Sequence, residues 1–531
     1  MPKLQIDQRD VVVPAGATVL DAAQALGIAV PTMCHMAGEP HFTSCMLCLV
    51  KEPSSGRMLP ACSALAEEGM GIETAGADVV EARRVALELL LSDHVGDCEG
   101  PCHRVCPAHM NIPRMIRQIA AGQMREAIET VKRDIALPAV LGRICPAPCE
   151  KACRRGAHDS AVAICLLKRY AADVDLASDA PYLAPCRPVT GRTVAIVGAG
   201  PAGLAAAYYL AQFGHTCVVL DERERAGGML RYGVPDDRLD RRVLDAEVGI
   251  LAKLGVAFRP TVHVEAVASL LAPTGPYDAV VLAAGPIGAA GASALGLAAS
   301  KLGVEADAHT FATSVRGVFA AGACVHPGHP AVRAVGDGKS AAISVDQYLR
   351  GADPSGPHRL FNCAVGRLRD GEMGEFLKEA DGRARVAPSG EPGAGFSAQE
   401  ALHEAQRCLH CDCRKNESCL LRKHSDTYGA RRQRYAGESR DRVERIFQHG
   451  EVVYEPGKCI KCGRCVRITE SAREPLGLTF VGRGFTVCVG VPFGEPLDRA
   501  LRTTGARCVE ACPTGSLAFR TGEDQAKENR P

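Results

Sequence analysis

The residues with the clearest chemical capacity in this sequence are its cysteines. The chain has 25 of them among 531 residues, and most stand in groups with two or three residues between neighbours. Thiolates at such spacings can converge on one metal ion or one iron–sulfur cluster. Disulfide-rich secreted scaffolds are short, and the N-terminus MPKLQIDQRD lacks the charged-then-apolar pattern of a signal peptide. The cysteines therefore predict metal ligation in a reducing, cytoplasmic compartment.

The first group predicts a 2Fe-2S cluster. Two residues separate its central pair, so one tight loop can aim both sulfurs at one iron, with strands near residues 4–6 and 11–13 and a helix at 18–25 around it. The predicted ligands are Cys34, Cys45, Cys48 and Cys62. A zinc ribbon, the alternative, usually has two such pairs. The order and spacing resemble the N-terminal ferredoxin domain of complex I large subunits and iron-only hydrogenases, which implies a β-grasp fold.

Two three-cysteine groups follow, among helical patterns at 78–91, 112–135 and 161–172. They are Cys98, Cys102 and Cys106, and then Cys145, Cys149 and Cys153. The segment resembles the helical domain of the glutamate synthase small subunit and of dihydropyrimidine dehydrogenase, where the ligands of two 4Fe-4S clusters interleave. The resemblance implies that Cys98, Cys102 and Cys153 share one cluster. It assigns Cys106, Cys145 and Cys149 to the other.

Each of these clusters needs a fourth ligand, and here the sequence departs from that family. His94 stands just before the first cysteine, as does a histidine ligand of a complex I cluster; an exposed polar histidine is the alternative. For the second cluster the family uses Gln or Glu near the position of Lys168, which cannot ligate iron as a cation. Cys165 lies one turn earlier on the same helical face and is the predicted ligand, with a buried structural thiol as the alternative.

A glycine-rich turn between a strand and a helix predicts a dinucleotide-binding fold. The strand spans 193–197, the helix 204–213, and Asp221 ends the next strand at 216–220. In this setting the glycines let the backbone approach a pyrophosphate at the helix N-terminus, and Asp221 can bond the adenosine ribose. The residues of the turn are Gly198, Gly200, Pro201, Ala202 and Gly203.

Three further stretches, 227–235, 278–285 and 317–322, resemble flavin-contacting parts of the glutamate synthase small subunit, which implies FAD. The implied contacts are Gly228, Arg231, Gly285 and Gly322. Ala323 replaces the family's aspartate, a change expected to alter the flavin potential. That family inserts a complete NADPH domain after the position of Gly285, but residues 286–316 are too few for one, with small residues at 289–291 expected to close a shortened loop. We therefore expect no NAD(P)H binding of that kind.

The C-terminal part contains two more groups. Cys459, Cys462 and Cys465 form half a ferredoxin loop, and Cys512 before Pro513 completes a predicted 4Fe-4S site that resembles one in complex I large subunits; Cys488 and Cys508 are left over. A further 4Fe-4S site is predicted at Cys408, Cys411, Cys413 and Cys419. Zinc is the alternative for both, and more so for the second, because a C-x-C pair is strained on one cubane. The basic stretch 423–436 is predicted to be solvated or partner-facing.

The fold class expected is multidomain α/β. The predicted parts are a 2Fe-2S ferredoxin-like domain at 1–77, a helical two-cluster domain at 78–178, a Rossmann-like FAD domain without NAD(P)H insertion at 179–355, a linker at 356–400 that includes the Pro- and Gly-rich run 385–395, a ferredoxin-like 4Fe-4S region at 401–520 and a disordered tail at 521–531. Overall the chain resembles the iron–sulfur region of a complex I or bidirectional hydrogenase diaphorase large subunit with a truncated glutamate-synthase-type flavin module inserted.

A flavin joined to about five clusters would split or merge electron pairs, since clusters pass single electrons. The net charge of +1 and the absence of Trp disfavour nucleic acid, and no apolar run could span a bilayer. No acid–base pair or nucleophile stands out, so no catalytic residue is predicted. The expected role is an electron-transfer subunit that links an NADH-oxidising flavin subunit to a hydrogenase, formate dehydrogenase or similar subunit, with electron bifurcation as one mode. The alternatives are a stand-alone FAD-dependent reductase of a small substrate or ferredoxin, and a scaffold with degenerate sites.

Overall fold

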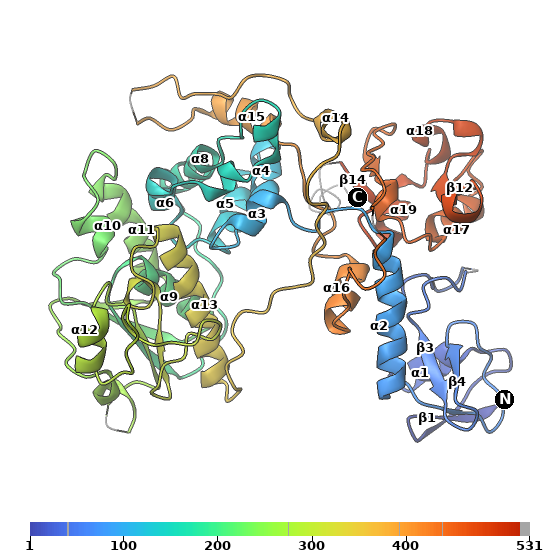
Figure 1. The fold of residues 1–531 in the computed structure, drawn as a ribbon, viewed down its shortest axis with the longest axis horizontal. Helices are drawn as coiled ribbons and strands as arrows, with labels where there is room; N and C mark the ends of the chain where they lie inside the picture. Colours follow the sequence, from blue (N-terminus) through green and yellow to red (C-terminus); the bar gives the residue numbers. More distant parts are fainter. Residues whose placement is uncertain (40–41, 274, 392, 438, 521–531) are drawn as a thin grey trace. The chain divides into compact units, whose positions relative to one another are not determined.

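The computed structural model describes residues 1–39, 42–273, 275–391, 393–437 and 439–520 (Figure 1). The chain forms two compact units, each assembled from separate stretches. Unit 1 contains Met1–Glu99, Leu360–Lys378 and His410–Pro531, and unit 2 contains Gly100–Arg359 and Glu379–Leu409. The predicted tail at 521–531 lies outside the described residues. No helix of the described residues is long and apolar enough to cross a membrane.

The N-terminal part of unit 1 confirms the predicted strands and helix. Strand β1 (Lys3–Ile6) pairs antiparallel with β2 (Arg9–Val12) and parallel with β5 (Gly71–Ile72), and β3 (Leu49–Glu52) forms a hairpin with β4 (Arg57–Pro60). Helix α1 (Val19–Ala25) begins with the capping box of Thr18 and Asp21. Buried side chains of these elements form one core.

Helix α2 (Ala77–Ser92) belongs to unit 1, although the sequence placed it with the helical cluster domain. The buried Arg83 of α2 explains this difference, because its guanidinium donates to the Leu49 carbonyl of β3 at 2.8 Å. The rest of unit 1 adds α14 (Glu372–Leu377), α16 (Leu420–Thr427), α17 (Arg464–Ser471), α18 (Leu497–Ala500), α19 (Gly505–Ala511) and the strand pairs β11 (Val452–Tyr454) with β14 (Leu517–Phe519) and β12 (Thr479–Val481) with β13 (Cys488–Gly490).

Unit 2 begins with short helices that carry the central cysteines. They are α3 (Pro101–Val105), α4 (Ile112–Ala120), α5 (Met124–Lys132), α6 (Pro138–Ile144), α7 (Pro148–Lys151) and α8 (Ile164–Leu176), joined later by α15 (Ala398–Gln406). The helix expected over 112–135 is two helices, because Gly122 at φ +74° turns the chain between α4 and α5.

The other part of unit 2 is a five-stranded parallel sheet in the order β10-β9-β6-β7-β8. Its strands are β6 (Thr193–Val197), β7 (Thr216–Leu220), β8 (Ala257–Arg259), β9 (Ala279–Leu282) and β10 (Val318–Ala320). Its helices are α9 (Pro201–Gln212), α10 (Met229–Tyr232), α11 (Arg241–Lys253), α12 (Gly288–Ala294) and α13 (Ala331–Leu349). Residues 289–291 therefore lie in a helix rather than a simple loop. One hydrophobic core joins this part to the short helices.

The predicted linker at 356–400 contains ordered structure. It includes α14 and the fully buried Cys363 in unit 1. Further along, Arg385 donates to Glu150 at 2.7 Å and the Val386 amide donates to Glu404 at 2.8 Å, both within unit 2. Bonds to the carboxylates of Glu150 and Glu404 thus fix this part of the segment in place.

Candidate iron–sulfur and dinucleotide sites

The four cysteines of the N-terminal group are brought together in unit 1. Each is at most 2% exposed, and their thiols bond to one another, Cys34 to Cys45 and Cys62, and Cys48 to Cys62. Hydrogen bonding from Cys62 lowers the pKa of the Cys48 thiol to about 7, whereas hydrogen bonding to Cys34 raises the pKa of Cys45 and Cys62. Four thiols this close could ionise together beside the positive charge that bound iron would supply.

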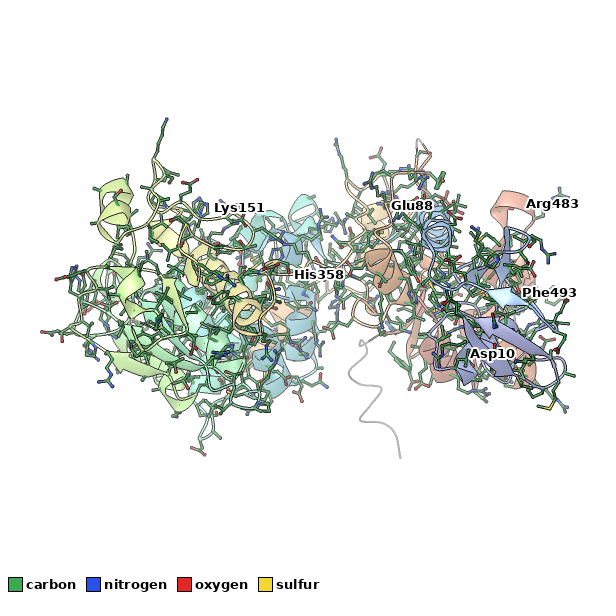
Figure 2. The ribbon with its side chains drawn as sticks, turned by 90° about the horizontal axis from the view of Figure 1, so that it is seen from below. Asp10, Glu88, Lys151, His358, Arg483 and Phe493 are labelled. Atoms are coloured by element: carbon green, nitrogen blue, oxygen red, sulfur yellow. The ribbon has the colours of Figure 1, made fainter. Side chains whose placement is uncertain are left out.

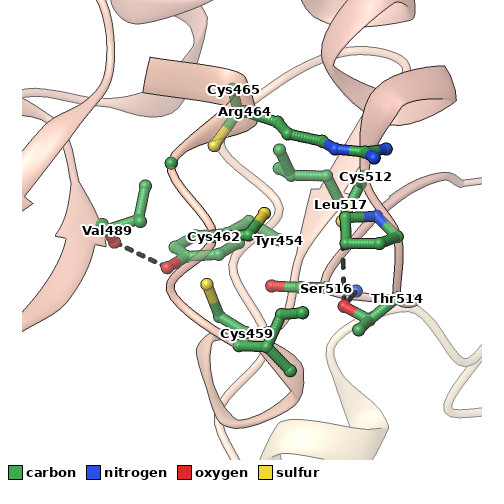
Figure 3. Close-up of a pocket in the computed structure, with 13 residues that line it drawn as sticks. Tyr454, Cys459, Cys462, Arg464, Cys465, Val489, Cys512, Thr514, Ser516 and Leu517 are labelled. Carbon is green, nitrogen blue, oxygen red and sulfur yellow. Dashed lines mark hydrogen bonds between the residues drawn. The ribbon is translucent and has the colours of Figure 1, made fainter. Parts of the chain in front are cut away.

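A pocket near the C-terminus is lined by all four cysteines predicted for the last site (Figure 3). The four cysteines line a small pocket that is partly open to solvent. Burial raises the pKa of Cys459 to about 11 and that of Cys462 to about 12. Gly463, at φ +74°, allows the turn that leads into α17. Three of the thiols come from one loop and the fourth from a distant segment of the chain, which is a set of four thiols that could hold a cubane cluster.

Unit 2 groups the predicted second helical-domain ligands, including the fourth. The Cys165 thiol bonds to the thiols of Cys145 and Cys149. Lys168 is 3% exposed and lies beside these sulfurs. Burial lowers the pKa of its ammonium group, but the charges of the nearby cysteines, Cys106 included, have the larger effect, so the pKa is raised overall. A buried cation among four thiols is an environment suited to an anionic metal–thiolate centre.

Hydrogen bonds join the turn at residues 153–159 to the segment that carries Cys408 within unit 2. Arg155, fully buried two residues after Cys153, donates to the carbonyl oxygen of Arg407 at 2.5 Å, and Arg407 directly precedes Cys408. The Arg407 side chain returns to the same turn by bonding Asp159 at 3.1 Å. Cys408 also belongs to the same hydrophobic core as Cys102 and Cys153. The motif spacing alone did not reveal this association.

A group of four buried cysteines in unit 1 includes one that the sequence analysis did not assign. Cys98, Cys363, Cys413 and Cys419 are between 1% and 8% exposed. The thiols of Cys98 and Cys363 bond to each other, and the Cys413 amide donates to the Cys98 carbonyl at 3.3 Å. Burial, followed by the charge of Cys413, raises the pKa of Cys419 to about 12. Cys363 stands alone in the sequence, so no spacing rule could have found it.

The grouping of Cys98 differs from the sequence-based one. It was expected to share a cluster with Cys102 and Cys153, but those residues belong to unit 2 and Cys98 to unit 1. Of the predicted group at 408–419, Cys408 belongs to unit 2, and Cys411, Cys413 and Cys419 belong to unit 1. These two predicted ligand sets remain predictions.

His94 is buried in unit 1. Burial, with the charges of Lys458 and Arg432, lowers the pKa of its imidazole to about 3, so the ring stays neutral at ordinary pH. Its Nδ1 has no hydrogen-bond partner among the residues that the structure describes. An exposed polar histidine, the alternative considered for this position, is therefore wrong.

The basic stretch 423–436 keeps Lys423, Arg431 and Arg434 exposed, as expected, while several of its arginines also bond within unit 1. Glu88 of α2, labelled in Figure 2, is 1% exposed and accepts from the Arg431 amide at 3.0 Å and the Arg434 guanidinium at 3.0 Å. Arg432 donates to the Ala364 carbonyl. Several of the arginines thus hold the stretch against α2 and the segment that carries Cys363.

The predicted dinucleotide-binding turn joins β6 to α9 and leaves open space beside Gly200. A Cβ on Gly198, which has φ +106°, would overlap the Ala283 carbonyl, and one on Gly203 would overlap the Gly198 carbonyl. At Gly200, by contrast, no described atom lies within 4 Å of such a Cβ. The α9 N-terminus carries no side-chain cap. Free backbone N–H groups beside open space fit a pyrophosphate.

The other predicted nucleotide contacts gather around this turn. A Cβ on Gly228 would lie 2.7 Å from Gly200 Cα, and one on Gly322 would lie 2.7 Å from the Ala202 Cβ, so both loops approach the turn closely. Gly285 follows β9 at φ +80°. The Asp221 carboxylate accepts from the amides of Ala199 at 2.5 Å and Arg223 at 2.8 Å, which fixes it at the end of β7.

Arg231 is turned toward protein partners. It is 9% exposed, its Nε donates to the Ala226 carbonyl at 2.7 Å, and its guanidinium pairs with Asp245. Its predicted flavin contact remains a prediction. Among the described residues, no three His, Cys, Asp or Glu side chains are arranged to hold a single metal ion.

These features define an iron–sulfur protein with a Rossmann-like nucleotide-binding domain. Comparison with protein families agrees with this class. Residues 2–76 match the family described as a 2Fe-2S iron–sulfur cluster binding domain, and residues 92–180 match dihydropyrimidine dehydrogenase domain II, a 4Fe-4S cluster domain. Residues 196–257 match the NAD(P)-binding Rossmann-like domain.

Curated relatives resemble part of the chain. The glutamate synthase [NADPH] small chain of Mycobacterium tuberculosis is 41% identical over 36% of this chain and 39% of its own length. The NADPH-Fe(3+) oxidoreductase subunit beta of Geobacter sulfurreducens is 39% identical over 35% of this chain and 28% of its own. The NADP(+)-dependent formate dehydrogenase subunit beta of Moorella thermoacetica is 37% identical over 35% of this chain and 29% of its own. The chain thus spans less than two fifths of these relatives.

Proposed function

We propose that this protein relays electrons between FAD and iron–sulfur clusters as a subunit of a cytoplasmic oxidoreductase complex. One observation carries the proposal. Helix α13 of the Rossmann-like domain packs directly on the loop after Cys106, where a Cβ on Gly336 would overlap the Pro107 carbonyl. Cluster ligands and the nucleotide domain therefore share one core in unit 2, which suits transfer between their cofactors.

The proposed clusters number five, one 2Fe-2S and four 4Fe-4S. The N-terminal group and the C-terminal pocket keep their predicted ligands. In unit 2, one cluster uses Cys106, Cys145, Cys149 and Cys165, and the other uses Cys102, Cys153 and Cys408, with Cys408 in the place given earlier to Cys98. The remaining cluster belongs to the four-cysteine group of unit 1 that includes Cys363. These centres would supply single-electron transfer, while the protein fixes their positions and surrounds them with buried charge.

FAD is proposed for the Rossmann-like domain, with its pyrophosphate at the turn beside Gly200. Bound flavin would supply the exchange between paired and single electrons. A single five-stranded parallel sheet is found in the described part of the chain. Nicotinamide chemistry is therefore assigned to a partner, an NADH-oxidising flavin subunit, and the final reaction to a hydrogenase or dehydrogenase subunit. Two of the relatives are named as beta subunits, which supports a complex.

Metal and flavin analysis of anaerobically purified protein tests the proposal. We expect about 18 irons per chain, from one two-iron and four four-iron centres, with matching sulfide and one FAD. Low-temperature EPR should resolve several reduced centres. Colourless protein, or about two zincs with little iron, would overturn the proposal.

The alternative is a stand-alone flavin reductase. Co-purification separates the two functions, because a stable complex with a nicotinamide-binding flavoprotein supports the electron-transfer subunit. Rapid NADPH oxidation by the isolated chain would contradict both the assignment of nicotinamide chemistry to a partner and the relay function.

A further inference from the structure

Cys363 stands outside every cysteine motif, yet it is one of the most buried thiols of unit 1, at 1% exposed. It lies in the stretch Leu360–Lys378, which joins unit 1 from a distant part of the sequence. Two backbone bonds dock it on the segment around Cys98: the Cys98 amide donates to the Cys363 carbonyl at 3.1 Å, and the Cys363 amide donates to the Cys98 sulfur at 3.3 Å. Its position is therefore specified by paired hydrogen bonds.

The other two thiols of the group approach from the stretch that begins at His410. Cys413 is docked by its amide on the Cys98 carbonyl at 3.3 Å. Its sulfur faces Gly515 so closely that a Cβ there would overlap it. The Cys419 sulfur accepts from the Arg422 amide at 3.5 Å. Amide donors on sulfurs are typical of thiolates that ligate iron–sulfur clusters, where they tune the potential.

Buried cations surround the same group. Lys458 is 3% exposed and Arg422 is 6% exposed. The Arg422 side chain donates to the Phe361 carbonyl, two residues before Cys363, at 2.7 Å. Four ionised thiols would be costly to bury without such charges, so the surroundings fit an anionic cluster.

We propose that Cys98, Cys363, Cys413 and Cys419 are the four ligands of one 4Fe-4S cluster, and that Cys363 supplies the ligand position for which His94 was predicted. The inference rests on the proposed function, which requires clusters in the chain. It is favoured over ligation by His94 because the Cys363 amide donates to the Cys98 sulfur at 3.3 Å and the two thiols bond to each other.

The test uses full-length protein purified anaerobically, with iron and sulfide measured for wild type, Cys363→Ser and His94→Ala. Cys363→Ser is expected to lose about four irons of the wild-type complement, while His94→Ala keeps all of them. Cys217→Ser is the matched control, since Cys217 is equally buried, at 1%, in β7 and outside every thiol group. It should retain full iron.

A spectroscopic measurement on the wild type keeps the test independent of variant folding. Protein labelled with [15N]histidine is reduced and examined by pulsed EPR for nitrogen coupled to a cluster. We expect no strong histidine coupling. The inference is overturned if Cys363→Ser keeps the wild-type iron content, or if the wild type shows a strong histidine coupling that disappears in His94→Ala. A wild type without iron would instead refute the proposed function itself.

Discussion

Replacing Glu404 with alanine should destabilise unit 2 strongly. This carboxylate is fully buried on α15 and joins three elements. It accepts from the Ala163 amide at 2.7 Å, the Val386 amide at 2.8 Å and the Arg407 guanidinium at 2.8 Å. Removing one partner of a buried ion pair costs about 3–5 kcal/mol, because the other charge stays in a low-dielectric site.

Glu404→Gln should cost less, about 1–3 kcal/mol. One amide oxygen can keep the two bonds on the Oε1 side, but the new NH₂ group faces the Val386 N–H and leaves one buried donor unsatisfied. Urea denaturation followed by circular dichroism measures both effects. For m near 3 kcal/mol per molar, the alanine midpoint falls by about 1–1.7 M.

Gln406→Ala, on the exposed face of the same helix, is the control and should stay within about 0.5 kcal/mol of wild type. If Glu404→Ala changed the midpoint no more than this control, the argument that Glu404 ties the Cys408 segment to α8 would be wrong.

Three further predictions concern other sites. Burial raises the pKa of Glu247 to about 7 in the folded protein, so the carboxyl of the unfolded chain ionises at lower pH. The free energy of unfolding should therefore fall by up to about 3.4 kcal/mol as the pH rises from about 4.5 to 7. Glu247→Gln should remove this pH dependence in urea melts at pH 5 and 8, and an unchanged dependence would contradict the account. Cys512→Ser should remove about four irons, whereas Cys508→Ser, which alters a neighbouring spare thiol, should not; equal iron contents would refute the C-terminal ligand set. Lys168→Met should shift the reduction potential of the adjacent centre to more negative values by on the order of 50–100 mV, because the buried cation no longer stabilises the added electron. A redox titration followed by EPR measures this shift, and a positive shift would be incompatible with this account.

Local signals in the sequence predicted much of the fold. Thr18 and Asp21 form the expected capping box, and the alternation of strand, glycine turn and helix at 193–213 appears as β6 and α9. Both depend on interactions within a few residues, which the sequence states directly. Helical periodicity also placed Cys165 on one face of its helix with position 168, and in the structure its thiol bonds to that of Cys145.

Long-range pairings were not accessible in this way. Cys98 and Cys102 are four positions apart but belong to different units, because Cys98 pairs with Cys363, 265 residues away. The tie between Arg155 and Arg407 likewise spans 252 residues. Spacing rules group ligands that are close in sequence, whereas these contacts are decided by which buried donors and acceptors meet after the chain has folded.

The discontinuous course of the chain sets an order of maturation. Unit 1 is interrupted after Glu99 and again after Lys378, and unit 2 is complete at Leu409. A ribosome that adds roughly 5–20 residues per second needs roughly 16–64 s to travel the 321 residues from Cys98 to Cys419 (419 − 98). Under the proposed ligation, the Cys98 thiol would stay unligated during that interval. Cluster delivery would then meet a finished unit 2 while unit 1 is still incomplete.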